Sequence, residues 1–251
     1  MSQYLQNKKG LVQNAFNKVY DKYDLMNDFM SIGIHRLWKK DMINWMAPLP
    51  KKKLIDMACG TGDLGKLFLE STNYAGKVLF VDPNSKMLKK GIERLKKHKN
   101  ISWKKGGAEK IPTPDNNFDY YCISFGLRNT KNINKSLKEA YRVLKPGGTA
   151  IITFFLLDEL YQKSLSIRSE GIGKYHMTSK KRWIFDKRVY GSKDWFCTNW
   201  AKVPENAIGV TDVGLNRILS QTDLKLIKHY QGNWKEVLGV FWQDVLVLKK
   251  A

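Results

Sequence analysis

The stretch that decides the fold reads LIDMACGTGDLG over residues 54–65. An apolar strand runs into a glycine turn, and the turn opens a helix. Gly60, Gly62 and Gly65 are spaced as in the dinucleotide-binding pattern G-x-G-x-x-G. Asp82 follows a second apolar strand, about where an acid that binds a ribose is expected. The sequence therefore predicts a cradle for a nucleotide-like cofactor that involves Gly60, Gly62 and Asp82.

Two further carboxylates bear on which cofactor this is. Asp63 lies at the helix N-terminus, where a pyrophosphate would take the backbone N–H groups, so it would repel phosphates. Asp56, at the end of the strand, adds a second negative charge at the mouth of the turn. S-adenosylmethionine (SAM) suits two carboxylates, because it has a sulfonium and an ammonium and no phosphate. We therefore expect SAM rather than NAD, the alternative being a turn capped by Asp63 with no ligand.

Composition favours one α/β domain in a reducing compartment. A chain of 251 residues is long enough for one domain with a good core. The polar start, residues 1–10, predicts no signal sequence, and the longest apolar run, residues 150–157, is too short to span a bilayer. Three widely spaced cysteines predict neither a disulfide framework nor a metal site. We expect a cytoplasmic protein.

The net charge of +21 has several interpretations. Only 8 of the 44 basic residues are arginine, and the lysines are scattered. This balance favours codon bias over a recognition surface. An anionic membrane surface and nucleic acid stay open as partners.

Strands and helices alternate after the first 50 residues, and this predicts an α/β fold. We expect a seven-stranded, mostly parallel sheet with helices on both faces and an N-terminal helical cap. Within a single domain, the predicted parts are the cap (1–50), a cofactor-binding core (51–155) and an acceptor-side region (156–251), whose first fifty residues look irregular. The predicted strands are residues 53–57, 77–81, 101–105, 118–124, 149–155, 224–230 and 241–249, and the predicted helices residues 64–71, 85–98, 133–143 and 213–221.

In open sheets of this kind the ligand lies beyond the carboxyl ends of the strands. The loops after the first four strands should therefore meet at one site. Asp82 can accept hydrogen bonds from both hydroxyls of a ribose. Gly106 and Gly107 would let the backbone approach a flat ring closely, although an ordinary turn uses such a pair equally well.

Three segments resemble the ubiquinone/menaquinone C-methyltransferase family (UbiE-like). They are residues 23–38 (YDLMNDFMSIGIHRLW), 124–129 (SFGLRN) and 142–148 (RVLKPGG), and the resemblance covers roughly residues 11–153. It implies a class I SAM-dependent enzyme that methylates a ring carbon of a polyprenylated benzoquinol or naphthoquinol. The SAM contacts that it implies here are Thr61, Asp82, Gly107, Ala108 and Ser124.

The chain departs from this family in two places. The family usually has Asn at the position of Gly107, so a side-chain contact is lost there. The Glu-Phe-Ser ending of the fifth strand is replaced by Phe154, Phe155 and Leu156, and residues 156–251 carry no family motif. The cofactor is therefore better defined than the acceptor.

Methylation of a ring carbon needs help from the protein, because the carbon becomes nucleophilic only when an adjacent phenol ionises. Arg128 is our candidate to hold the phenolate oxygen, with a structural salt bridge as the alternative. His35 is our candidate to take a proton, with a capping or packing role as the alternative.

The acceptor side and the partners leave more alternatives. Aromatic and basic residues mix over residues 154–200, which fits a membrane-interface surface or a lid, an RNA-binding face, or ordinary aromatic packing. A nucleic-acid methyltransferase is disfavoured, because the loop after the fourth strand lacks an Asn/Asp-Pro-Pro-aromatic motif and Cys122 lies inside the strand. Another small aromatic or lipid acceptor, a non-catalytic SAM-binding subunit and a homodimer stay open.

Overall fold

The computed structural model describes residues 34–130, 132–168, 170–239 and 241–251, and these fall in two compact units. The first unit comprises the chain up to Ile151 together with Lys250, and the second comprises Ile152–Lys249 with Ala251. Strand β5 (Leu144–Leu157) begins in the first unit and ends in the second.

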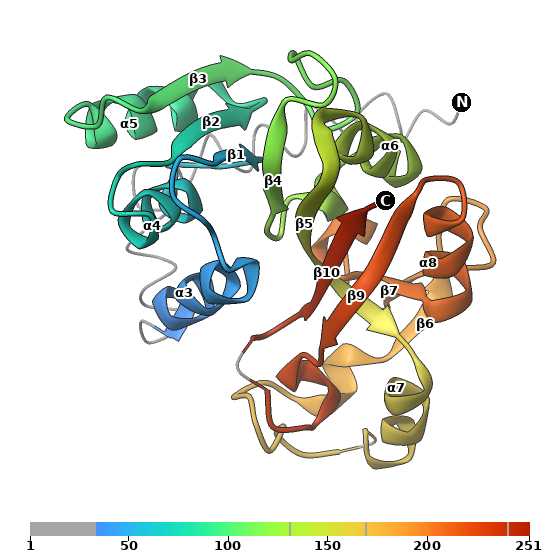
Figure 1. The fold of residues 1–251 in the computed structure, drawn as a ribbon. Coiled ribbons are helices and arrows are strands. Elements are labelled where there is room, and N and C mark those ends of the chain that lie inside the picture. The colour runs from blue at the N-terminus through green and yellow to red at the C-terminus, as the bar shows by residue number, and fades with distance from the viewer. Residues whose placement is uncertain (1–33, 131, 169, 240) are drawn as a thin grey trace. The chain divides into compact units, whose positions relative to one another are not determined.

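The first unit is a parallel sheet with the strand order β3-β2-β1-β4-β5 (Figure 1). Strand β1 pairs in parallel with β2 and β4, and β2 pairs in parallel with β3. The central strands are almost wholly buried, as expected for a parallel sheet covered on both faces. The predicted α/β class is confirmed. The elements are α3 (Ile34–Met46), β1 (Lys53–Met57), α4 (Asp63–Ser71), β2 (Lys77–Asp82), α5 (Ser85–Leu95), β3 (Ile101–Lys105), β4 (Phe118–Ile123), η2 (Leu127–Asn129) and α6 (Ile133–Val143).

Local sequence explains where these helices begin. The Asn84 side chain accepts hydrogen bonds from the N–H groups of Lys86 and Met87 and so caps α5. Helix α4 lies directly against β2, because a Cβ added at Gly65 would come within 2.2 Å of the Phe80 ring. That third glycine of the pattern therefore serves helix–strand packing.

The second unit has a sheet of its own around the end of β5. Strand β8 pairs in parallel with β5, β7 pairs antiparallel with β8, and β6 pairs antiparallel with β7. Strand β10 pairs with β5 and β9. The elements are α7 (Glu159–Ser164), η3 (Leu165–Ile167), η4 (Lys180–Trp183), β6 (Phe185–Arg188), β7 (Trp195–Thr198), η5 (Pro204–Asn206), β8 (Ile208–Thr211), α8 (Asp212–Leu219), β9 (Leu224–Tyr230), η6 (Asn233–Lys235) and β10 (Asp244–Lys250).

Residues 156–205 are more regular than predicted, since they contain α7, β6 and β7. Both strands are four residues long, too short for an alternating pattern to show in the sequence. With β8 they add three strands to those predicted. Aromatic side chains from this segment fill a core around Phe155, in which Tyr161, Trp183, Phe185 and Trp234 are buried. These rings therefore pack in the ordinary way, one of the alternatives considered above.

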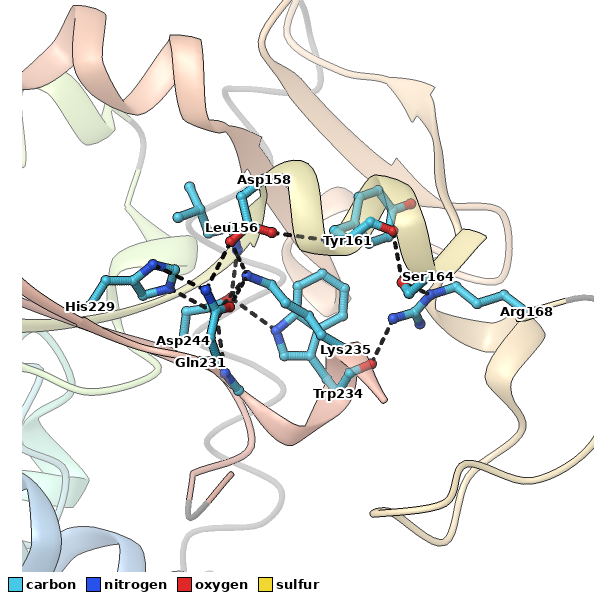
Figure 2. Close-up of polar contacts among 11 residues, drawn as sticks. Leu156, Asp158, Tyr161, Ser164, Arg168, His229, Gln231, Trp234, Lys235 and Asp244 are labelled. Atoms are coloured by element: carbon cyan, nitrogen blue, oxygen red, sulfur yellow. Dashed lines mark hydrogen bonds and ion pairs between the residues drawn. The ribbon is translucent and has the colours of Figure 1, made fainter. Parts of the chain in front are cut away.

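A buried ionic network joins β5, η6 and β10 in the second unit (Figure 2). The fully buried Lys235 ammonium lies 2.7 Å from both Asp158 and Asp244. Asp244 also accepts hydrogen bonds from the Leu156 N–H group and from the His229 ring. Burial alone would raise the pKa of Asp244, but the bonds from His229 and Lys235 hold it below its usual value. The Lys235 ammonium is thus shared by two carboxylates inside the unit.

Among the described residues, no helix is both long and apolar enough to cross a membrane.

Candidate functional site

The loops after the first three strands meet at Asp82, the last residue of β2. Its carboxylate accepts hydrogen bonds from the N–H groups of Gly60, at 2.9 Å, and Asn84, at 2.8 Å. Its carbonyl oxygen accepts one from the Gly106 N–H group at 3.2 Å. Gly60 and Gly62 have φ angles of 57° and 90°, which glycine adopts at little cost. The glycine turn is thus tied to the acid predicted to bind a ribose.

The Asp82 carboxylate keeps capacity for a ligand. Its two hydrogen bonds occupy two of roughly four acceptor positions on a carboxylate. Burial raises the pKa of Asp82 to about 6, although both N–H bonds lower it. A ligand hydroxyl bonded to Asp82 would therefore also favour its ionised form.

Asp56 lies beneath the glycine turn, where it is fully buried, and not at the mouth as we expected. One carboxylate oxygen accepts a hydrogen bond from the Gly65 N–H group at 3.0 Å, and the other lies 3.4 Å from the Cys122 sulfur. Burial raises the pKa of Asp56 to about 7. This carboxylate anchors the first turn of α4, so its predicted contact with the cofactor stays a prediction.

Asp63 does not present a free negative charge. It forms ion pairs with Lys39 of α3 and Arg94 of α5. Burial alone would raise the pKa of Asp63, but these two cations lower it to about 2. The Arg94 guanidinium also donates to the Thr61 hydroxyl at 2.9 Å. The predicted repulsion of phosphates is therefore largely cancelled, and it no longer discriminates between the two cofactors.

The loop after β4 packs against the loop after β1. A Cβ added at Gly126 would lie 2.4 Å from the Ala58 Cβ, so the two loops touch. Ala58 and Phe125 both have φ near 55°, an uncommon conformation for residues other than glycine. Among the residues that the structure describes, the buried hydroxyl of Ser124 has no hydrogen-bond partner. A buried orphan hydroxyl is costly, and a polar ligand would satisfy it.

The predicted residues Gly107 and Ala108 follow directly on Gly106, which is bonded to Asp82. Gly107 forms an isolated bridge with Lys110, and Ala108 is buried. Only Gly106 is bonded to Asp82, so the predicted cofactor contacts of Gly107 and Ala108 stay predictions.

The two predicted catalytic residues lie in different parts of the first unit. Arg128 lies in η2, half-buried, with its guanidinium carbon 5.8 Å from the centre of the Phe125 ring. His35 lies in the first turn of α3, and its side chain is outside the described residues. Lys39, one turn later, reaches Asp63, which places α3 beside the glycine turn. The sequence did not predict the ion pairs of Lys39 and Arg94 with Asp63, because no spacing rule connects either residue with it.

A family model described as the ubiE/COQ5 methyltransferase family matches residues 2–165. Two proteins named ubiquinone/menaquinone biosynthesis C-methyltransferase UbiE are similar over this part. One, from Ruegeria sp., is 45% identical over 151 residues, which are 59% of this chain and 60% of that protein. The other, from Brucella anthropi, is 44% identical over 167 residues, which are 62% of this chain and 64% of that protein. The chain thus spans less than two thirds of the length of these relatives.

Solved structures share the fold. A SAM-dependent methyltransferase from Aquifex aeolicus matches with a TM-score of 0.56 and 17% identity, over 85% of this chain and 89% of that one. A SAM-dependent methyltransferase from Thermotoga maritima, called a possible histamine N-methyltransferase, matches with a TM-score of 0.57 and 16% identity, over 95% and 99%. Because the family model matches residues 2–165, more than half of the sequence, the chain belongs to the ubiE/COQ5 methyltransferase family.

Proposed function

We propose that this protein catalyses the SAM-dependent methylation of a ring carbon of a polyprenylated benzoquinol or naphthoquinol. The observation that carries the proposal is the family match over residues 2–165, which contains every element of the cradle. The names of the relatives point to ubiquinone and menaquinone biosynthesis.

The cradle fits SAM at three places. Asp82 has unused acceptor positions for the ribose hydroxyls. The Ser124 hydroxyl, which lacks a partner among the described residues, can bond to a polar group of the cofactor. The turn at Gly60 and Gly62, whose positive φ angles glycine adopts at little cost, would let a ligand approach the backbone closely. Bound SAM supplies an electrophilic methyl group on its sulfonium, and we assign its contacts to Asp56, Gly60, Thr61, Gly62, Asp82, Gly107, Ala108 and Ser124.

The remaining chemistry belongs to the acceptor. Arg128 stays cationic at any working pH, so it can hold the phenolate oxygen and increase electron density on the neighbouring ring carbon. His35 can take the proton that the phenol or the ring carbon loses. Holding the ring in line with the methyl group and excluding water supply most of the acceleration.

Complementation tests the proposal directly. The chain is expressed in a bacterial strain that lacks its quinone C-methyltransferase, and methylated and demethylated quinones are measured by mass spectrometry. We expect methylation of ubiquinone, menaquinone or both to return. Arg128→Ala should abolish it while the purified variant still binds SAM, whereas Arg217→Ala, in the second unit, serves as the matched control. Restored methylation by Arg128→Ala would exclude the role given to this residue.

A second candidate function is methylation of another small aromatic or lipid acceptor. The specific observation in its favour is that the family match ends at residue 165, so the following 86 residues lie outside it. If the purified protein binds SAM and complementation fails, this candidate replaces the first. A protein that binds SAM and methylates no acceptor would be a non-catalytic subunit.

The proposed acceptors also imply a location. A polyprenyl tail partitions into the hydrocarbon of a bilayer, so the enzyme has to meet its acceptor at a membrane surface. We infer that the protein works in the cytoplasm and makes peripheral contact with the inner face of the membrane. The net charge of +21 is of the sign that anionic lipids attract.

A further inference from the structure

A short hairpin in the second unit, residues 172–179, has an unusual surface. Its ends are joined by an isolated bridge between Ile172 and Ser179 and by the hydrogen bond from the Gly173 N–H group to the Thr178 carbonyl, at 2.9 Å. It lies between η3 and η4, on the periphery of the second unit (Figure 1).

Glu236, which follows η6 in the connection between β9 and β10, holds this hairpin in place. Its carboxylate accepts a hydrogen bond from the Lys174 N–H group at 2.9 Å and lies 2.7 Å from the His176 ring nitrogen. The other ring nitrogen of His176 lies 2.8 Å from the Thr178 hydroxyl. These contacts hold the hairpin tip beside Glu236, and Leu238 follows Glu236 by two residues.

Three large apolar side chains stand out from this surface. Met177 is 85% exposed, Leu238 is 84% exposed and Ile172 is 69% exposed. Among the described residues these are the three most exposed large apolar side chains, and all three belong to this one small structure. We call these three residues the hairpin patch. Exposed apolar side chains that gather in one place mark an interaction surface.

The charge around the hairpin patch is mostly positive. Lys174 lies at the hairpin tip, and Lys180, Lys181 and Arg182 come directly after the hairpin. The exposed acids nearby in the sequence are Glu170 and Asp186. The Glu236 side chain is 3% exposed and bound to His176, so it presents no charge to the solvent. Apolar side chains surrounded by cations complement a surface that is apolar inside and anionic outside.

We propose that the hairpin patch docks this protein on the surface of an anionic lipid bilayer, with its three apolar side chains among the lipids and the lysines against the headgroups. Single-stranded RNA would call for exposed rings on which bases stack. None of the three residues of the hairpin patch is aromatic, and Trp183 is buried in the core. The one tyrosine of the hairpin, Tyr175, is half-buried and has the Lys174 ammonium 5.1 Å from the centre of its ring. Peripheral segments enter the bilayer interface with this kind of composition. The proposal rests on the proposed function only for its purpose, which is access to a lipid-soluble acceptor.

Vesicle sedimentation of the full-length protein tests the docking without any turnover. Phosphatidylcholine vesicles with and without phosphatidylglycerol are the probes. The patch variants are Ile172→Ser with Met177→Ser, and Lys174→Glu with Lys181→Glu. The matched controls lie on β9 of the same unit, where Ile227 is also exposed: Ile227→Ser, and Lys225→Glu with Lys228→Glu. Thermal unfolding checks that each variant is folded, and a soluble quinol with a short tail checks the proposed function separately.

We expect the wild type to bind anionic vesicles and not neutral ones. The lysine variant should bind at least roughly thirtyfold more weakly, because each of its two lysines contributes about 1 kcal/mol near such a surface. The serine variant should bind on the order of tenfold more weakly, because two apolar side chains no longer leave water for the bilayer interface. The controls should bind within about twofold of the wild type. Equal losses in patch and control variants would show attraction by net charge alone and would overturn the proposal. Absence of vesicle binding by the wild type would overturn the proposal too. Neither outcome would change the methylation of the soluble quinol, which tests the proposed function separately.

Discussion

In the first unit the buried Asp56 and Asp82 accept hydrogen bonds mainly from backbone N–H groups, whereas in the second unit Asp244 faces the Lys235 ammonium and the His229 ring. The pKa of each carboxyl follows its partners: burial raises it at Asp56 and Asp82, and the cations lower it at Asp244. A carboxylate bonded to N–H groups can still take a ligand. A carboxylate enclosed by cations, such as that of Asp244, instead stabilises the fold of its own unit.

The family match follows the same division. It covers the unit that carries the glycine turn and Asp82, and it stops soon after the second unit begins. In the second unit, charged side chains instead form internal ion pairs, such as that of Lys235 with Asp158. We infer that the first unit is constrained by its cofactor and the second by its own packing.

Breaking the second unit's network should have the largest effect. Lys235→Met leaves the buried Asp244 and the partly buried Asp158 without their shared cation, so the free energy of unfolding should fall by about 3–5 kcal/mol. Urea unfolding followed by the fluorescence of Trp234 and its neighbours measures this. Combining Lys235→Met with Asp244→Asn should recover part of the loss. The exposed Lys228→Met is the control, and a loss as small as that of the control would contradict the role of Lys235.

The two units should also respond to pH with opposite signs. Asp56 has a pKa of about 7 in the folded protein and about 3.9 in the unfolded chain, so its contribution is complete below pH 4 and is lost as the pH rises through 7. Three pKa units correspond to at most about 4 kcal/mol. Asp244, whose pKa is lowered, contributes above its unfolded pKa, and this stability is lost as the pH falls further.

Hydrogen exchange along the chain measures this comparison at several pH values. Protection of β1 and α4 should increase from pH 7 to pH 4, and Asp56→Asn should flatten this response while leaving that of β10 unchanged. A first unit whose protection falls over the same range would show that Asp56 is ionised in the folded protein.

A methyl group at Gly65 should disturb the helix that carries the glycine turn. Gly65→Ala places a Cβ within 2.2 Å of the Phe80 ring, so α4 has to move away from β2 at a cost of about 1–3 kcal/mol. Differential scanning calorimetry gives the loss, and adding Phe80→Leu should restore part of it. The control is Gly107→Ala, where the added Cβ meets only the flexible end of Glu109. Equal losses at both positions would rule out this close packing.

Removing the negative charge of Asp82 should give the smallest effect. Asp82→Asn keeps the size of the side chain and removes a charged acceptor, so the Kd for SAM should rise about tenfold or somewhat more. Isothermal titration calorimetry measures the Kd, and the exposed Glu93→Gln is the matched control. An unchanged Kd in a folded variant would remove Asp82 from the cofactor site.

The cradle could be predicted from the sequence because its signals are local. The strand, the glycine turn and the helix that starts at Asp63 are contiguous, and Asp82 ends the next strand. Such patterns depend on backbone conformation and burial, which short stretches of sequence encode.

The rest depends on contacts between distant residues. Asp158 meets Lys235 across 77 positions, and Arg94 meets Asp63 across 31, so no spacing rule connects them. Strands β6 and β7 are four residues each and exist because β8 offers an edge to pair with. We expected Asp56 at the mouth of the turn because the sequence does not show that the Gly65 N–H group and the Cys122 thiol are its neighbours.

Asp244 also has a consequence for strand alignment. Its carboxylate accepts from the Leu156 N–H group on β5, from the Gly232 N–H group and from the Trp234 indole, besides Lys235. If β10 slid along β5 by one residue, Asp244 would turn to the other face of the sheet and all these donors would be stranded at once. One side chain thus distinguishes the native register from its neighbours, and it makes misaligned pairing of β5 with β10 during folding unfavourable.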